Sequence, residues 1–330
     1  MCAKPGETDA DDERFFDPAI KCCSTVPELS NFLVGGILSD AGADADSVKG
    51  RQSAVRRIKE SVAVTPLGLG QSAAFKLLYE NSDAAFGRSL KLRCPHYVEE
   101  TGHCGIWRYR GAICSSWFCK HVRGAVGRAF WRDSLERLLV EIESSLGAWC
   151  VLQLDIGAEA LRDLYKPGAD AQPGSLNSAH LDDRPDPARQ RRIWGRWFGR
   201  EEEFYIECAR LVDRLSWSEV LDICGAESRV QAELTRRAYE RLLSDEIPAA
   251  LKVGPVQLVQ VTSAINRVRS YSPLDPLDVP GAVMDVLRYF DGAPCKNALD
   301  RIAAEKGIQL SDDLVRKLCD FEVLVDADPR

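Results

Sequence analysis

Thiol and imidazole side chains gather in one short stretch of this chain. The stretch from residue 94 to residue 121 holds Cys94, Cys104, Cys114, Cys119, His96, His103 and His121. An adjacent pair, Cys22 and Cys23, stands upstream. Thiolate sulfur and imidazole nitrogen are ligands of zinc, iron and iron–sulfur clusters. The stretch therefore predicts a metal centre, whose expected ligands are Cys22, Cys23, Cys94, Cys104, Cys114 and Cys119.

The spacing of these cysteines indicates a site without identifying its metal. The runs Cys94-x9-Cys104-x9-Cys114-x4-Cys119 differ from the C-x-x-C pairs of zinc fingers and bacterial ferredoxins. One zinc ion or one 4Fe–4S cluster takes about four protein ligands, so two thiols would remain. Adjacent cysteines suit two irons of a cluster better than one zinc. We therefore expect an iron–sulfur cluster (4Fe–4S), with zinc or iron as the alternative, and buried apolar cysteines as a competing interpretation.

Basic residues follow the last of these cysteines. Lys120, His121 and Arg123 come directly after Cys119. Such groups would balance the negative charge of a cluster or bind an anionic substrate group, so we predict them as cofactor-binding residues. A solvated basic turn is the alternative, particularly for Lys120.

The run that starts at Cys94 resembles a known family. It reads CPHYVEETGHCGIW over residues 94–107, and it is similar to the C-P-[FY]-L-x-x-x-G-x-C-x-I-[YW] run of YkgJ-type cysteine-cluster proteins. The resemblance implies bound zinc or iron, or a 4Fe–4S cluster. Flagellin lysine-N-methylases share a similar cluster, which implies a protein- or peptide-modifying enzyme as an alternative. The chain departs from the family at Gly111, where a proline is usual, and at the additional Cys119.

Bulk composition limits the remaining possibilities. The chain has 330 residues, 45% of them hydrophobic and 28% charged, which is typical of globular proteins with a core of their own. A net charge of −7 argues against nucleic acid as a partner. No apolar run is long enough for a bilayer, so we expect no membrane partner. The first residues lack the pattern of a secretory signal, so we expect a cytoplasmic protein with reduced thiols.

Composition and periodicity also predict the organisation of the chain. We expect a disordered acidic arm (1–14), a cysteine-cluster metal domain (15–165), a linker with an Arg/Trp segment (166–200), a helical segment (201–247) and a winged-helix-like domain (248–330). The Arg/Trp segment alternates arginines with aromatic residues, a pattern that suits single strands of nucleic acid. Because Glu201, Glu202 and Glu203 follow at once, we expect its arginines to form pairs within the protein or with a partner.

Within these regions the pattern predicts individual elements. Helices are expected in 27–39, from Ser47 as N-cap to Arg57, over 126–146, and over 203–215 and 217–243. Gly147 is expected to end the third of these, and a buried strand is expected at 149–154.

The C-terminal region combines a β-ribbon with three short helices. Strands are expected in 256–264, 268–271 and 277–279, and helices in 282–290, 297–305 and 312–318, with Ser311 as an N-cap and a turn at Asp291-Gly292. This order resembles the peptide chaperone of pyrroloquinoline quinone biosynthesis over residues 255–325. The resemblance implies a unit that docks a peptide or protein partner. A compact helical cap without a ligand is the alternative.

Together these observations predict a mostly α (α+β) protein with a cysteine-rich metal-binding domain. Its expected function is metal binding of the YkgJ-like type. The alternatives are a methylase-like modifying enzyme that uses the same centre, and a structural zinc protein that acts in interactions.

Overall fold

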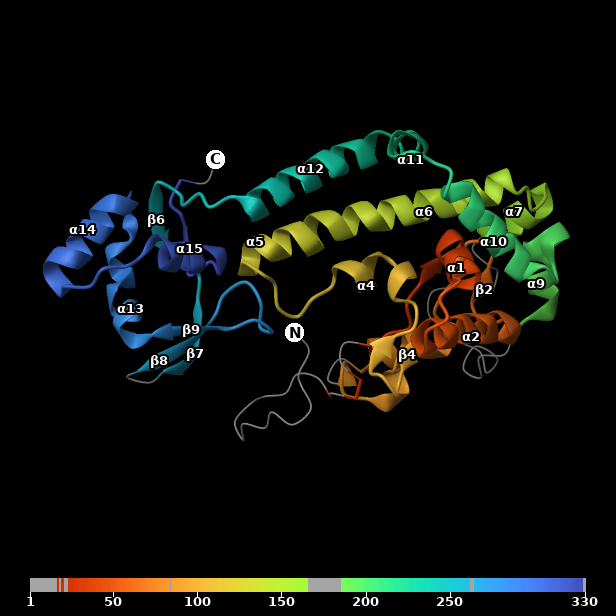
Figure 1. Ribbon diagram of the computed structural model, residues 1–330, viewed down its shortest axis with the longest axis horizontal. Helices are drawn as coiled ribbons and strands as arrows, with labels where there is room; N and C mark the ends of the chain where they lie inside the picture. Colours follow the sequence, from red (N-terminus) through yellow and green to blue (C-terminus); the bar gives the residue numbers. More distant parts are fainter. Residues whose placement is uncertain are drawn as a thin grey trace. The chain divides into compact units, whose positions relative to one another are not determined.

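The computed structural model describes residues 17, 19–20, 23–82, 85–165, 185–261 and 264–328. Helices hold 57% of the residues and strands 11%, so the prediction of a mostly α chain is confirmed. The chain divides into two compact units (Figure 1). Unit 1 comprises Met1–Ser115 and Leu139–Arg229, and unit 2 comprises Ser116–Leu138 and Val230–Arg330. The domain boundaries expected from composition stay predictions, and the acidic arm, Cys22 and most of the linker lie outside the described residues.

In its described residues, unit 1 is built mainly from helices with two very small sheets. Its helices are α1 (Asn31–Ser39), α2 (Ala45–Glu60), α3 (Ala73–Glu80), α4 (Ala112–Ser116), α6 (Glu136–Gln153), α7 (Ala158–Tyr165), α9 (Pro187–Trp194), α10 (Glu201–Val212) and α11 (Trp217–Cys224). Its strands are β1 (Leu29–Ser30), β2 (Val64–Thr65), β3 (Gly68–Leu69), β4 (Tyr97–Val98) and β5 (His103–Cys104). The antiparallel order is β1-β3-β2 in one sheet and β4-β5 in the other.

The core of unit 1 forms where α1 packs against α10. Val34 and Ile37 of α1 meet Phe204 and Tyr205 of α10 in one buried cluster. Gly35 permits this close approach, because a Cβ atom there would lie 1.8 Å from the Tyr205 carbonyl oxygen. The backbones of the two helices can therefore touch only at a glycine.

Buried polar groups of unit 1 connect its elements. The Asn31 side-chain amide donates to the carbonyls of Pro66 and Gly147, each at 2.9 Å. The Tyr205 hydroxyl donates to the Thr65 carbonyl at 2.7 Å. These bonds hold the β2–β3 hairpin against α6 and α10, because a buried donor without an acceptor costs stability.

Unit 2 combines helices with two three-stranded sheets. Its helices are α5 (Gly124–Arg128), α12 (Ala226–Leu243), α13 (Gly281–Val286), α14 (Cys295–Lys306) and α15 (Asp312–Asp320), with a π-helical segment at Ala129–Leu135. Its strands are β6 (Ala250–Val253), β7 (Gln257–Val261), β8 (Ile265–Arg269), β9 (Leu277–Pro280), β10 (Asp291–Pro294) and β11 (Leu324–Asp326). The antiparallel orders are β7-β8-β9 and β10-β6-β11, and the core includes Leu251, Val286, Ile302 and Leu318.

Most of the predicted helices are present, and several local predictions are wrong. Gly147 does not end a helix, and no strand forms at 149–154, since α6 continues to Gln153. Asp44, and not Ser47, caps α2, because its carboxylate accepts from the Ser47 backbone N–H. Asp291-Gly292 begins strand β10 instead of forming a simple turn. The Ser311 cap of α15 is confirmed by its bond from the Leu314 N–H.

Candidate functional site

The cysteine-rich stretch of unit 1 forms a compact loop structure. The Cys94 N–H donates to the Cys23 carbonyl at 2.8 Å, and Cys104 pairs with Tyr97 across β4 and β5. Burial raises the pKa of Cys94 to about 12, and charge on Cys104 and Cys114 would raise it further. Burial also raises the pKa of Cys104. Burial therefore favours the neutral thiol form of Cys94.

The predicted metal centre is not borne out. Across the described ranges, no group of three or more His, Cys, Asp or Glu side chains could hold a metal ion. Cys23, Cys94, Cys104 and Cys114 belong to unit 1, Cys119 belongs to unit 2, and Cys22 lies outside the described residues. The prediction of a metal-binding function is therefore wrong for the described residues, and so are the functions that depended on that centre. Shared residue type and closeness in sequence did not bring the ligands into a coordinating arrangement.

The histidine beside Cys94 is a buried structural group. The Ser53 hydroxyl donates to the Gly50 carbonyl at 2.7 Å and therefore accepts from Nδ1 of His96 at 2.6 Å. Arg57 donates to Nε2 of His96 at 3.3 Å. Burial, with the neighbouring Arg57 charge, lowers the pKa of His96 to about 3. A neutral imidazole with both nitrogens bonded connects the cysteine loop to α2 and has no position left for a metal.

The basic residues predicted to bind a cofactor lie in unit 2. The Arg123 guanidinium forms two bonds with the Asp320 carboxylate, at 2.9 Å and 2.8 Å, and donates to the Leu242 carbonyl at 2.7 Å. It therefore satisfies carbonyls at the end of α12 and serves a structural role. His121 packs against the rings of Phe118 and Tyr271. A cofactor role of Lys120 and His121 stays a prediction.

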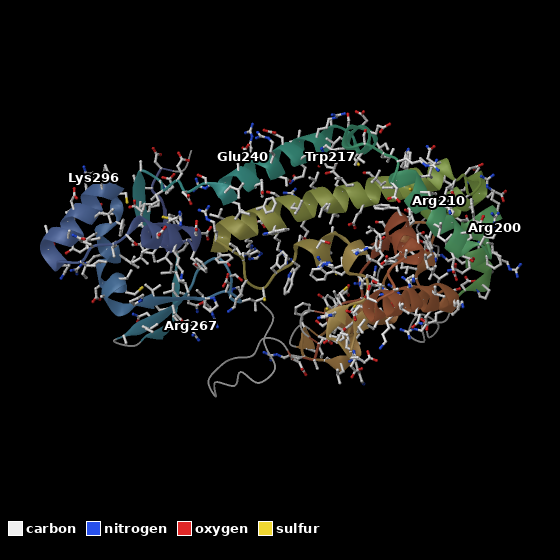
Figure 2. The ribbon with its side chains drawn as sticks, viewed as in Figure 1. Arg200, Arg210, Trp217, Glu240, Arg267 and Lys296 are labelled. Carbon is white, nitrogen blue, oxygen red and sulfur yellow. The ribbon has the colours of Figure 1, made fainter. Side chains whose placement is uncertain are left out.

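The arginines of the Arg/Trp segment form pairs within unit 1. Arg192 pairs with Asp163 at 3.3 Å, and Arg196 pairs with Asp155 at 3.4 Å. Arg200, labelled in Figure 2, lies 4.7 Å from the ring centroid of Trp197 and also pairs with Glu203. These ion pairs agree with the expected intramolecular role. Nucleic acid as a partner is not tested by them.

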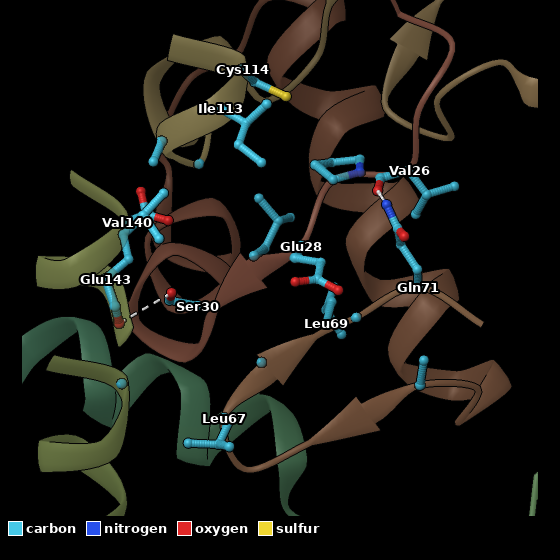
Figure 3. Close-up of a pocket in the computed structure, with 18 of the residues that line it drawn as sticks. Val26, Glu28, Ser30, Leu67, Leu69, Gln71, Ile113, Cys114, Val140 and Glu143 are labelled. Atoms are coloured by element: carbon cyan, nitrogen blue, oxygen red, sulfur yellow. Dashed lines mark hydrogen bonds between the residues drawn. The ribbon is translucent and has the colours of Figure 1, made fainter. Parts of the chain in front are cut away.

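Another candidate site is a cavity of unit 1 that the sequence did not reveal. Its volume is about 790 Å³, within the range of small-molecule sites (Figure 3). The walls come from the segment before α1, the β2–β3 hairpin, α3, α4 and α6. Apolar side chains line much of it, including Val26, Leu29, Leu67, Leu69, Ile113 and Val140.

Glu143 of α6 supplies the cavity with a carboxyl group of unusual pKa. Burial raises its pKa to about 7, although the Ala112 N–H bonds to the carboxyl group and opposes the shift. Glu143 lines the cavity on the α6 side, while Gln71 lies on the opposite side (Figure 3). A carboxyl group with a pKa near 7 can both give and take a proton at physiological pH.

Sequence reasoning missed Glu143 because it looked for thiols and imidazoles. One signal was present, since Glu143 follows the apolar Leu139 by four residues and thus borders the apolar face of the helix. A charged residue at such a position is often partly buried. Glu143 is partly buried in the folded protein because α4 and the β1 segment pack near it.

In comparisons with known proteins, the chain matches no family model, no curated protein and no solved structure. The resemblance to YkgJ-type proteins therefore stays an expectation from the residues alone. Within the described residues, no helix combines the length and the apolar character needed to cross a bilayer.

Proposed function

We propose that unit 1 binds a small organic molecule in the Glu143 cavity and that Glu143 exchanges a proton with this molecule. The observation that carries the proposal is a half-buried carboxyl group, raised in pKa to about 7, in the wall of a cavity of about 790 Å³. Mostly apolar walls with a few polar groups are typical of ligand sites. Perturbed carboxyl groups in such cavities are typical of acid–base residues.

The energetics of Glu143 favour a functional role over a structural one. A half-buried carboxylate with a raised pKa lowers the stability of the folded chain above that pKa. Within the described residues its side chain forms no ion pair that would offset this cost. Groups that lower stability are commonly retained where binding or catalysis needs them.

The test fills part of the cavity with a tryptophan side chain and measures whether ligand binding is lost. Val140 is 46% exposed and lines the cavity, whereas Leu152 is 59% exposed on the same helix and does not line it. A fragment library is screened against the full chain by ligand-observed NMR. We expect fragments that bind the wild type and L152W to lose binding to V140W. Fragments that bind all three proteins equally, or no binding at all, would contradict the proposal.

We also propose, as a second function, that the C-terminal part of unit 2 docks a peptide or protein as a winged-helix-like module. The support is the element order, in which β7, β8 and β9 are followed by α13, α14 and α15. Ile265 on β8 is 52% exposed. Cross-linking in cells should identify one partner that I265E loses and that K296E, a change on α14, retains. A partner list that is the same for both variants would argue against this docking face.

A further inference from the structure

We infer that the molecule bound in the Glu143 cavity carries a cationic nitrogen, as an ammonium or amidinium group, which pairs with the Glu143 carboxylate. This inference rests on the proposed function of unit 1 and names the chemical class of its ligand. It follows from the charges of the cavity wall, from the use of its hydrogen-bond donors, and from the shape of the site.

The charged groups of the cavity wall do not balance. The cavity is lined by two carboxylates, Glu28 and Glu143, and by one ammonium group, Lys76. Lys76 pairs with Glu28 at 3.4 Å. The side chain of Lys76 is 50% exposed to solvent, and that of Glu28 is 64% exposed. Glu143 is the lining carboxylate without an ion-pair partner in the part of the chain that is described. The ionised cavity wall therefore has one uncompensated negative charge.

Two polar side chains of the cavity wall already have hydrogen-bond partners. Ser30 donates its hydroxyl to the Glu143 backbone carbonyl at 3.3 Å. Gln71 donates its amide N–H groups to the Val26 carbonyl at 2.7 Å and to Thr25 Oγ1 at 3.4 Å. These groups do not neutralise the Glu143 carboxylate, which receives a backbone N–H from Ala112. A carboxylate has about four acceptor positions, so the others are open to donors from a ligand.

The apolar part of the cavity wall suits an organic body on the ligand. Ile113 and Val140 are 56% and 46% exposed and provide apolar wall area on the Glu143 side of the cavity (Figure 3). A small inorganic cation would leave these two side chains uncovered. An organic cation with an aromatic or aliphatic body would cover them and place its nitrogen at Glu143.

The number of protons released on binding provides a second measurement of the pairing between the ligand and Glu143. A cation within about 4–6 Å of a carboxyl group lowers the pKa of that group. Since Glu143 is partly protonated in the free protein near neutral pH, binding of a cation should release protons. The affinity should therefore rise with pH up to about 7 and then level off.

The test compares benzylamine with benzyl alcohol, which has the same ring and a neutral head group. Binding to the full chain is measured by calorimetry at about pH 6 and about pH 8, in buffers of different ionisation enthalpy. The variants are E143Q and, as a matched control, E159Q on the exposed surface of α7. Thermal melts confirm that each variant is folded.

We expect the wild type and E159Q to bind benzylamine at least about tenfold more tightly than benzyl alcohol at about pH 8, as a charge-assisted bond would give. The preference should disappear in E143Q, together with the proton release at about pH 6. Equal binding of amine and alcohol by the wild type would overturn the cationic ligand and leave the cavity's binding function standing. Failure of both probes and of every library fragment would overturn the proposed function and the inference together.

Discussion

At the scale of single residues, Glu143 couples the stability of unit 1 to pH. Its pKa is raised by burial from 4.5 to about 7, so the folded chain holds this proton more tightly than the unfolded chain. Stability therefore falls as the pH rises from about 4.5 to about 7, and the loss persists above that range. The amide of E143Q has no proton to lose.

We expect E143Q to be more stable than the wild type by about 1–2 kcal/mol at pH 8 and equal to it near pH 4, a figure reduced for partial solvent screening. Urea unfolding at both pH values measures the difference. E159Q serves as the control and should stay within about 0.5 kcal/mol of the wild type throughout. A stability gain of E143Q that is the same at both pH values would show that Glu143 does not have the shifted pKa.

His96 couples stability to pH with the opposite sign. Its pKa is lowered from 6.5 to about 3 by burial, so the unfolded chain takes up a proton that the folded chain does not. Stability is therefore fully present above about pH 6.5 and is lost as the pH falls toward 3. Ser53 and Arg57 hold the neutral ring in place.

We expect H96N to lower the unfolding free energy by about 1–3 kcal/mol at pH 7, because Ser53 and Arg57 lose a well-placed partner. This deficit should shrink toward pH 4, where only the wild type has lost stability through its histidine. Chemical unfolding over this pH range is the measurement. A deficit that stays constant from pH 7 to pH 4 would mean that the folded chain does not keep His96 neutral.

At the scale of elements, alanine substitutions of two helical glycines are expected to have opposite effects on stability. A Cβ at Gly35 would lie 1.8 Å from the Tyr205 carbonyl oxygen and 2.9 Å from the Ala209 Cβ. A Cβ at Gly147 would find its nearest neighbour, Asn31 Oδ1, at 3.8 Å. The packing of α1 against α10 leaves no space for a side chain at position 35, whereas there is space for one at position 147 within α6.

We expect G35A to destabilise unit 1 by about 3 kcal/mol or more, because the backbones of α1 and α10 must move apart to accommodate the added Cβ atom. G147A should instead stabilise it by about 0.5–1 kcal/mol, because alanine favours the helix over glycine. Thermal unfolding of both variants provides the measurement. If both substitutions had the same effect, the close contact between α1 and α10 would be wrong.

At the scale of the whole molecule, each unit has its own buried cluster. The cluster of unit 1 includes Trp194 and Phe204, and that of unit 2 includes Val286 and Ile302. Separate cores of this size are expected to unfold as separate cooperative steps.

We expect calorimetry to resolve two unfolding transitions that respond to different substitutions. G35A should lower only the transition of unit 1. R123A should lower only that of unit 2, by about 2–4 kcal/mol, because Asp320 and the end of α12 lose their partner. R316A, whose ion pairs are exposed, should cost at most about 1 kcal/mol. A single transition that shifts equally in G35A and R123A would contradict this division.

Local sequence patterns predicted most helices and their order. Helical spacing identified α1, α10, α12 and the three C-terminal helices, and Ser311 was recognised as a cap. These predictions succeeded because periodicity and capping depend on residues within one or two turns. Gly147 and the segment 149–154 failed because packing kept α6 helical past a glycine, against the local signal.

Residue types and their order along the chain determined the mostly α character, the helical periodicity and the surplus of acidic charge, since each depends on near neighbours or on composition alone. Only the tertiary structure decided that the cysteines among the described residues do not form a metal site, that His96 is a bonded core residue, and that Glu143 lines a cavity. The physical reason is that ligand geometry and pKa depend on desolvation and on contacts between segments far apart in sequence. Glu143 acquires its raised pKa from burial by the walls around it, against the opposing bond from Ala112, and only folding brings these groups within reach of α6.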